Sequence, residues 1–282
     1  MRPRRCSGSD APRRNRRMQV AAVLVALWTA VAGCAAEPAD QARPAAPRSA
    51  PVPVRPAVVE PDLAALPEAT TFTEIPQAPV DQAADQPASG VLLRIKRDTA
   101  VHSAPGGAPF AKLPPVQLGN PTWVPVVEQQ GEWARVLLPS RPNGSTGWVW
   151  TGSGAEVEKA RSPYLVDVDI DARRLRVFRD GAQVGGWTVG VGAEESPTPR
   201  GRTYIMAAIE ETVTNFSPVI LPLGTHSNTY TTYGGGPGTV ALHTWPDPAV
   251  FGQASSDGCV RVPQEALQFL ATLPLGTLVL LR

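Results

Sequence analysis

The sequence predicts a mainly β protein in which two small β-rich domains follow a long N-terminal region without a core. Between residues 91 and 282 the apolar residues come in short alternating runs, broken by Gly, Pro and Asn-Gly turns. Residues 34–90 are rich in Pro and Ala and almost free of aromatic side chains. Helical periodicity is limited to one short stretch near the C-terminus, so we expect one or two short helices.

Residues 1–33 have the features of an export signal. Seven arginines lie within the first 17 residues, and "MQVAAVLVALWTAVAG" follows with fewer apolar residues than the roughly 20 that a spanning helix needs. Val31-Ala32-Gly33-Cys34 resembles the lipobox of bacterial lipoproteins, which implies that lipid on Cys34 anchors the chain to a membrane. An ordinary signal peptide and a retained short anchor are the alternatives. All three place the later residues outside the cytoplasm, in the cell envelope.

Residues 34–90 read as a Pro- and Ala-rich tether, because this composition cannot bury a core. We expect weak order as far as residue 88. Residues 18–282 carry 19 basic and 24 acidic side chains. With the arginine-rich start removed, no basic excess is left for a nucleic acid, and we expect no such partner.

The first β-rich domain is predicted over residues 91–160. Its turns and runs, "TAVHSAPGG", "GEWARVLL" and "TGWVW", resemble bacterial SH3-like domains of exported wall proteins. Four of the seven tryptophans lie here (Trp123, Trp133, Trp148 and Trp150). They fit the core of a small barrel better than a ligand groove. His102 follows a strand and is expected at the surface.

The second β-rich domain is predicted over residues 161–282. In "YLVDVDID" the apolar residues alternate with Asp167, Asp169 and Asp171, which indicates a strand with a buried face and a solvated acidic face. A hairpin is expected at Asp180-Gly181. Further strands are expected at "RTYIMAAI", "TVALHTW" and "GTLVLLR". Pro263 suits the first position of a helix whose apolar face holds Ala266, Phe269, Leu270 and Leu273.

Cys259 is the one thiol of the exported folded part, since Cys6 lies in the signal and Cys34 at the lipobox. No internal disulfide is then possible, and the flanking Ser-Asp-Gly indicates a turn rather than a core. His243 lies sixteen residues earlier, at the end of a predicted strand. A nearby imidazole lowers the pKa of a thiol and returns its proton to a leaving amine. The N–H groups of Gly258 and Cys259 are a candidate oxyanion hole.

Arg261, two residues beyond the thiol, is suited to a substrate carboxylate, with a salt bridge to a neighbouring acid as the alternative. His226, in "GTHSN", is a candidate cleft residue, or else a structural residue held by hydrogen bonds. "YGGGPG", residues 233–238, has no Lys-Ser/Thr after it and reads as a mobile loop beside the cleft rather than a phosphate loop.

His243 followed by "SSDGCVRV" resembles the L,D-transpeptidase catalytic domain, whose signature is a His and then Ser-x-Gly-Cys-(Ile/Val)-Arg. "VGVGAEESPTPRGRTYIM" and "LPLGTHSNTYTTYGGGPGTVALH" resemble two further segments of that family, and the chain ends in its closing strand. The resemblance covers about residues 162–282. It implies a β-sandwich and a cysteine acyltransferase that acts on peptidoglycan stem peptides.

Carried over by position, the resemblance makes Cys259 the nucleophile and His243 the general base and acid, with Gly258, Ser256 and Arg261 completing the site. The donor would be a tetrapeptide stem that loses D-alanine to a thioester, and a neighbouring stem amine would then form a 3→3 cross-link. The family uses no metal or organic cofactor and is acylated by carbapenems. We expect a monomer.

Two positions depart from the family's pattern. Thr244 stands where a Gly usually follows the histidine, at the carbonyl that orients the imidazole. Asp257 stands where many members have His or Lys, and a carboxylate there would disfavour a thiolate. The alternative function is therefore a non-catalytic wall-binding lipoprotein. A papain-like endopeptidase has its cysteine before its histidine, and a sortase-like enzyme has its histidine much further upstream, so both fit poorly.

Overall fold

The structure is a computed structural model that describes residues 62–282. The predicted signal peptide, the lipid site at Cys34 and the first part of the tether lie outside the described residues. Strands far outnumber helices in this part of the chain, which confirms the prediction of a mainly β protein. Within residues 62–282 no helix is both long and apolar enough to cross a bilayer.

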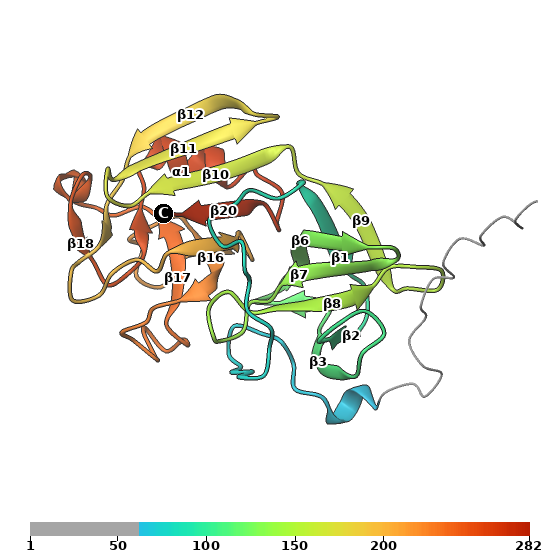
Figure 1. Ribbon diagram of the computed structural model, residues 1–282. Coiled ribbons are helices and arrows are strands. Elements are labelled where there is room, and N and C mark those ends of the chain that lie inside the picture. The colour runs from blue at the N-terminus through green and yellow to red at the C-terminus, as the bar shows by residue number, and fades with distance from the viewer. Residues whose placement is uncertain (1–61) are drawn as a thin grey trace, which may run out of the picture. The chain divides into compact units, whose positions relative to one another are not determined.

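The first β-rich region is a seven-stranded antiparallel sheet in the order β3-β2-β8-β7-β6-β1-β9 (Figure 1). Between β3 and β6 in the chain, β4 and β5 pair with each other as a separate two-stranded ribbon. Its identification as SH3-like stays a prediction. The strands are β1 Val91–Ile95, β2 Thr99–His102, β3 Pro109–Leu113, β4 Val116–Gln117, β5 Asn120–Pro121, β6 Trp123–Gln130, β7 Trp133–Leu137, β8 Thr146–Trp150 and β9 Val157–Arg161.

The expected tryptophan core is present in part, since Trp123 and Trp150 are only half-buried, and His102 is not at the surface. Trp133 and Trp148 are buried, and the His102 ring meets Trp133 edge-on at 5.0 Å. His102 is only 4% exposed, and its Nδ1 lies 2.6 Å from the carbonyl of Gly107. The expectation failed because β2 pairs with both β3 and β8, which covers the end of the strand.

Residues 62–90 correct the prediction of a weakly ordered tether. After a short 3₁₀ helix, η1 (Leu63–Ala65), isolated bridges join Glu68 to Lys112 and Glu74 to Arg141. Ala69 and Ile75 are buried in the same apolar cluster as the first sheet. The composition is poor in apolar residues, but the few that are present lie in contact with a core that other residues build.

The second β-rich region holds a five-stranded sheet, β12-β11-β10-β20-β14, and a four-stranded sheet, β15-β16-β17-β19. A short parallel pair, β13-β18, connects them to the turn before Cys259. The strands are β10 Tyr164–Asp169, β11 Arg174–Arg179, β12 Ala182–Thr188, β13 Val191–Gly192, β14 Gly201–Tyr204, β15 Ile209–Glu210, β16 Val219–His226, β17 Thr239–His243, β18 Ala254–Ser256, β19 Val260–Arg261 and β20 Leu278–Leu281.

These two sheets share one apolar core, to which α1 (Gln264–Leu270) adds Ala266, Leu267 and Leu270. The predicted hairpin is present, with β11 and β12 joined at Asp180-Gly181. The predicted helix is also present, although Pro263 caps it rather than occupying its first turn. The second 3₁₀ helix, η2 (Pro248–Val250), lies in the loop that separates His243 from Cys259.

Strand β20 buries both of its faces, and this joins the two β-rich regions. Val279 and Leu281 lie in the core of the second region, whereas Leu278 and Leu280 lie in the cluster of the first sheet. Alternate residues of a strand point to opposite faces, so one uninterrupted apolar strand serves two cores. The two predicted domains are thus packed on a common strand.

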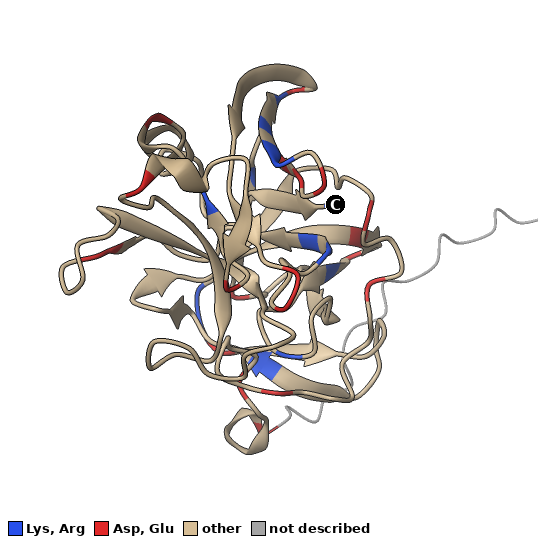
Figure 2. Cartoon of the chain, turned by 90° about the vertical axis from the view of Figure 1, so that its left-hand side faces the viewer, with Lys and Arg blue, Asp and Glu red and all other residues tan. Residues whose placement is uncertain are grey.

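Charged residues are interspersed over the described residues (Figure 2), and one acid lies where the sequence placed a solvated face. Asp167 is fully buried, with Arg176 Nη2 at 2.7 Å and Arg282 Nε at 2.6 Å from its carboxylate. The alternation along β10 identified the strand correctly. It could not show that the arginines of β11 and the C-terminus would cover the second face.

Candidate active site

His243 and Cys259 lie at the same hollow, a cleft of about 570 Å³. Strand β17 ends at His243 and pairs in parallel with β19, which begins directly after Cys259. The register opposes His243 to Arg261, so the histidine and the thiol come from neighbouring strand ends. The loop between them, which contains η2, allows this closure. The sequence prediction that the two side chains meet is therefore consistent with the strand pairing.

The imidazole of His243 is oriented by its own neighbour. Its Nδ1 lies 2.6 Å from the carbonyl oxygen of Thr244, which can only accept a hydrogen bond, so Nδ1 carries the proton. The ring also packs edge-on against Phe216, with centroids 5.0 Å apart. Nε2 is left as the basic nitrogen of a residue that lines the cleft and is 7% exposed.

Thr244 is accommodated without backbone strain. The described non-glycine residues with positive φ are Leu118, Arg173, Asp180 and Asn215, so Thr244 has an ordinary conformation. Its N–H donates to Ser217 Oγ at 3.0 Å, and its hydroxyl donates to the carbonyl of Phe216 at 3.1 Å. A side chain at this position thus adds a support for the carbonyl that orients His243.

The turn that carries the thiol is braced by the Ser-Pro-Thr-Pro segment. Ser196 Oγ donates to the carbonyl of Ser256 at 3.0 Å, and Thr198 Oγ1 donates to the carbonyl of Gly258 at 2.9 Å. Ser256 Oγ donates to the carbonyl of Cys259 at 2.5 Å. Gly258 has φ +118°, a conformation that residues with a Cβ rarely adopt. Ser256 and Gly258 therefore shape the turn.

The N–H of Gly258 is not free to act as the oxyanion-hole donor that the sequence predicted. It points to Ser256 Oγ at 3.2 Å and is therefore engaged within the turn rather than directed at a substrate oxygen. The reason is local, because a hydroxyl two residues earlier competes for an amide in a tight turn. Of the two predicted oxyanion donors, this leaves the N–H of Cys259.

The thiol and the imidazole are both biased toward their neutral forms. Burial raises the pKa of Cys259, an effect that the charge of Asp257 adds to and that Arg261 and a backbone hydrogen bond from Ala241 oppose. Burial also lowers the pKa of His243. These directions are opposite to those of a resting thiolate–imidazolium pair. Neither direction supports a thiol already ionised by its neighbour, so the ionisation of Cys259 by His243 stays a prediction.

Asp257 is bound from across the cleft. The phenol of Tyr233 donates to Asp257 Oδ2 at 2.8 Å, and this hydrogen bond raises the pKa of Tyr233. Tyr233 belongs to the glycine-rich loop that the sequence placed beside the cleft. The carboxylate is thus turned toward this loop while its charge still acts on the thiol.

Replacing Asp257 by Asn is expected to make the thiol more acidic. Removing the negative charge removes one cause of the raised pKa of Cys259, so alkylation by iodoacetamide should reach half of its maximum rate at a lower pH. The measurement is the alkylation rate as a function of pH. Tyr233→Phe is the matched control, since it removes the hydrogen bond but keeps the charge. An unchanged midpoint in Asp257→Asn would contradict the electrostatic assignment.

Arg261 lies at the cleft with its guanidinium above the Trp245 ring, 4.1 Å from the centroid. Its Nη1 donates to the carbonyl of Ser255 at 3.2 Å. No ion pair to Arg261 is found within residues 62–282, which disfavours the salt-bridge alternative. The stacked, preoriented cation suits a substrate carboxylate or carbonyl.

His226 is not a cleft residue, which corrects one of the two roles considered for it. It is fully buried, its Nε2 lies 2.8 Å from the carbonyl of Thr71, and its backbone N–H donates to Asn143 Oδ1 at 2.9 Å. Burial lowers the pKa of His226 to about 4, so the ring is neutral at neutral pH. The role it does have is structural, and its partners are more than 80 positions away in sequence.

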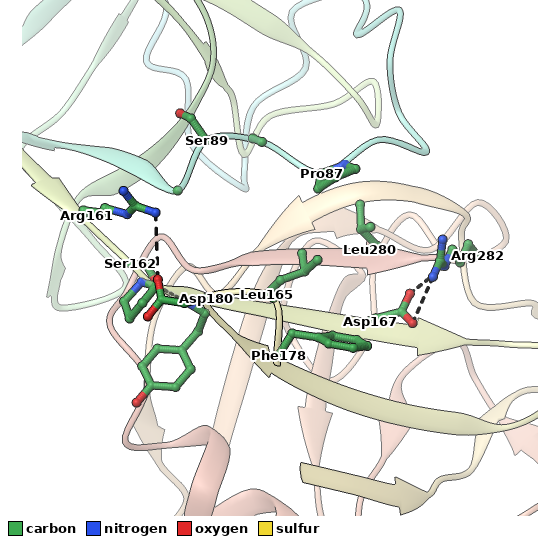
Figure 3. A pocket seen from close by; sticks show the side chains of 15 residues that line it. Pro87, Ser89, Arg161, Ser162, Leu165, Asp167, Phe178, Asp180, Leu280 and Arg282 are labelled. Carbon is green, nitrogen blue, oxygen red and sulfur yellow. Dashed lines mark hydrogen bonds and ion pairs between the residues drawn. The ribbon is translucent and has the colours of Figure 1, made fainter. Parts of the chain in front are cut away.

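A second hollow of about 450 Å³ lies between residues 87–90 and strands β10 and β20 (Figure 3). Its charged side chains are already paired with each other, Asp167 with Arg282 and Arg161 with Asp180. The rest of its wall includes the apolar Leu165, Phe178 and Leu280. Its lining contains no cysteine or histidine, and the cleft of Cys259 is therefore the candidate site.

Several residues of the site had no assigned role at the sequence level. Phe216 and Ser217 support His243, Ser196 and Thr198 brace the turn, and Tyr233 binds Asp257. The Ser-Pro-Thr-Pro segment was a usable signal, because it belongs to the family resemblance. Nothing local marks Phe216 and Ser217, which lie on an irregular stretch between β15 and β16.

The fold and the site together define a β-sandwich domain with a cysteine and a histidine at one cleft, beside the ends of two neighbouring strands. Residues 163–281 match the family model of YkuD, the L,D-transpeptidase catalytic domain. An L,D-transpeptidase catalytic domain is therefore present in this stretch of the chain.

The chain is similar to a Bacillus licheniformis protein that carries the name L,D-transpeptidase YkuD. The two are 26% identical over 150 residues, which is 51% of this chain and 84% of the relative. Among solved structures, an L,D-transpeptidase from Mycobacterium smegmatis is 14% identical with a TM-score of 0.36, covering 56% of this chain and 99% of its own. L,D-transpeptidase 3 from Mycobacterium tuberculosis is 12% identical with a TM-score of 0.42, covering 71% and 98%.

Proposed function

We propose that the protein is an L,D-transpeptidase that forms 3→3 cross-links in peptidoglycan through an acyl-enzyme on Cys259. The thiol attacks the carbonyl of the third residue of a tetrapeptide stem, and D-alanine leaves. An amine of a neighbouring stem then takes the acyl group from the thioester. The observation that carries this proposal is the placement of Cys259 and His243 at one cleft, on the domain that matches the L,D-transpeptidase family.

Proton transfer follows from the orientation of His243. Because Nδ1 donates to the Thr244 carbonyl, Nε2 accepts the proton of the thiol as the carbon–sulfur bond forms. The imidazolium then gives this proton to the departing amine of D-alanine. In the second half-reaction the attacking amine loses a proton to Nε2, and the thiol is protonated again when the thioester breaks.

The N–H of Cys259 is the proposed donor to the oxyanion. In a trans peptide unit the carbonyl and the following N–H point in opposite directions. Thr198 holds the carbonyl of Gly258, and Thr198 does not line the cleft. The Cys259 N–H therefore points away from Thr198, where it can stabilise negative charge on the attacked carbonyl.

The remaining parts of the proposal concern location and partners. We propose an exported, lipid-anchored protein of the cell envelope, held through Cys34, that acts on peptidoglycan stem peptides as a monomer without metal or organic cofactor. The signal, lipobox and SH3-like patterns in the sequence support this proposal. The interspersed charges give no support for a nucleic-acid partner.

Cys259→Ala is expected to abolish both reactions of the enzyme. Wild-type protein incubated with a disaccharide-tetrapeptide should release D-alanine, and with a carbapenem should gain the mass of one drug molecule on the peptide that contains Cys259. The variant should do neither, because no other thiol lies in residues 62–282. Mass spectrometry of the intact and digested protein measures both outcomes.

Two results would contradict the proposal. A carbapenem adduct that persists in Cys259→Ala would place the nucleophile elsewhere. Wall sacculi that bind wild type and Cys259→Ala equally, with no D-alanine release by either, would favour the non-catalytic wall-binding lipoprotein.

A further inference from the structure

We propose that Arg141, from the first β-rich region, is a positioning residue for the active site of the second region. It fixes the loop of residues 227–238, here called the cleft loop, and through this loop it sets the entry of the donor peptide. This inference rests on the proposed function for its substrate. It gives the first β-rich region a part in the reaction beyond that of a spacer or a wall-binding module.

The cleft loop forms one wall of the site. Ser227, Tyr230, Tyr233 and Gly238 all line the cleft that holds Cys259. The loop connects β16 to β17, so its second end leads directly into the strand that carries His243. A displacement of this wall would change the shape of the cleft without touching the thiol.

Arg141 binds both ends of the cleft loop at once. Its Nη1 donates to the carbonyl of Ser227 at 3.2 Å, and its Nη2 donates to the carbonyls of Tyr230 and Pro237 at 3.1 and 3.0 Å. These carbonyls come from the beginning, the first turn and the end of the loop. A guanidinium presents several donors in a fixed plane, which an ammonium cannot reproduce.

Gly238 shows that the loop is shaped around this cation. It has φ +71°, and a Cβ at this position would lie 2.2 Å from the carbonyl oxygen of Tyr230 and 3.3 Å from Arg141 Nη2. The absence of a side chain thus lets the Tyr230 carbonyl and the guanidinium meet. The Ser227 N–H closes the loop by donating to the carbonyl of Gly238 at 2.8 Å.

The segment that carries Arg141 makes further hydrogen bonds to the residue before the cleft loop. Arg141 lies in the connection between β7 and β8, where Asn143 Nδ2 donates to the carbonyl of His226 at 2.7 Å and Asn143 Oδ1 accepts the His226 N–H. His226 is held from its other side by Thr71. The residue that precedes the cleft loop is therefore held by Asn143 of the same connection and by one further segment, at Thr71.

The aromatic residues of the cleft loop connect the position of the loop to the active site. Tyr230 and Tyr233 pack against each other, with ring centroids 5.8 Å apart, and Tyr233 reaches Asp257 two positions before the thiol. With the ends of the loop released, this wall would no longer be held where a peptide stem enters. A small thiol reagent does not depend on that wall, whereas a donor peptide does.

The test compares Arg141→Lys with Arg135→Lys in the full chain. Arg135 is a matched control, because it is another arginine of the first sheet that donates to a backbone carbonyl, that of Val80, away from the cleft. Arg141→Lys is expected to lower kcat/KM for the disaccharide-tetrapeptide by about 10- to 100-fold, the size of effect that misplacement by an ångström produces. Alkylation of Cys259 by iodoacetamide should stay at the wild-type rate.

Gly238→Ala should disturb the contact between Arg141 and the Tyr230 carbonyl from the loop side, and it should lower kcat/KM for the donor to a similar extent. Hydrogen exchange over residues 227–238 should accelerate in Arg141→Lys and Gly238→Ala but not in Arg135→Lys. The positioning role would be overturned if hydrogen exchange were unchanged in both Arg141→Lys and Gly238→Ala. It would also be overturned if exchange were faster but these variants turned over the donor as fast as Arg135→Lys. If the wild type fails to turn over the donor, the proposed function falls with the substrate part of this inference, while hydrogen exchange still decides whether Arg141 holds the loop.

Discussion

His243→Ala is expected to slow acylation of Cys259 by about 10²- to 10⁴-fold, the range that positioned general bases supply. The effect should be large here because burial disfavours the ionised form of the thiol. Burial raises the pKa of Cys259, so attack depends on a base that removes the proton during the reaction. The measurement is the rate of carbapenem adduct formation, followed by mass spectrometry.

His102→Ala provides the control for this experiment. His102 makes the same type of contact, from Nδ1 to a backbone carbonyl, but in the first sheet and away from the cleft. The folded fraction of each variant, measured by circular dichroism, corrects the rates for any loss of stability. Equal corrected rates for His243→Ala and wild type would exclude His243 as the base.

The pH dependence of acylation tests the same assignment. Nε2 must be neutral to accept the thiol proton, and burial lowers the pKa of His243 below its ordinary value of 6.5. The neutral form therefore persists to lower pH, and the rate should fall only when the pH drops below 6.5. A fall that begins above pH 7 would contradict the lowered pKa of His243.

Asp81→Ala is expected to lower the free energy of unfolding by about 3–5 kcal/mol, the cost of leaving a buried charge without its partner. Arg202 Nη2 donates to Asp81 Oδ1 at 2.7 Å, and Arg202 Nε donates to Asp81 Oδ2. Both side chains are almost fully buried, at 3% and 5% exposed. Urea unfolding followed by tryptophan fluorescence measures the change.

Two further variants make this prediction specific to the buried pair. Asp81→Leu combined with Arg202→Met removes both charges and should recover much of the loss, since apolar replacement of a whole buried pair is often tolerated. Arg200→Ala removes an exposed pair with Asp171 just before β14 and should have little effect. A loss below about 1 kcal/mol in Asp81→Ala would show that water reaches the pair.

The local pattern of the sequence was sufficient for most strands of the second region. The alternation at residues 164–170, the Asp-Gly turn at 180–181 and the apolar C-terminal run all correspond to observed elements. Strand β16 was not predicted from its own residues, because Pro222 and Gly224 interrupt its pattern. The position of Cys259 after a turn and of His243 at a strand end likewise followed from neighbouring residues.

The surroundings of the acids and histidines did not follow from local pattern. Asp167 has the spacing of a solvated residue, yet Arg176 and Arg282 enclose it. His226 lies in a segment typical of the site, yet its ring faces Thr71. Residues 62–90 lack the apolar content for a core of their own, yet Ile75 and Asp81 are buried. In each case the covering partner comes from a distant part of the chain.

The sequence by itself located the thiol of Cys259 in a glycine turn, His243 at a strand end, and the alternation that makes the strands. The tertiary structure alone decided that β20 serves two cores, that Arg141 reaches the cleft loop and that Asp81 meets Arg202. The physical reason is that side-chain periodicity fixes which residues share a face. Which faces meet is set by packing between segments far apart in sequence, and the local pattern of residues does not specify these contacts.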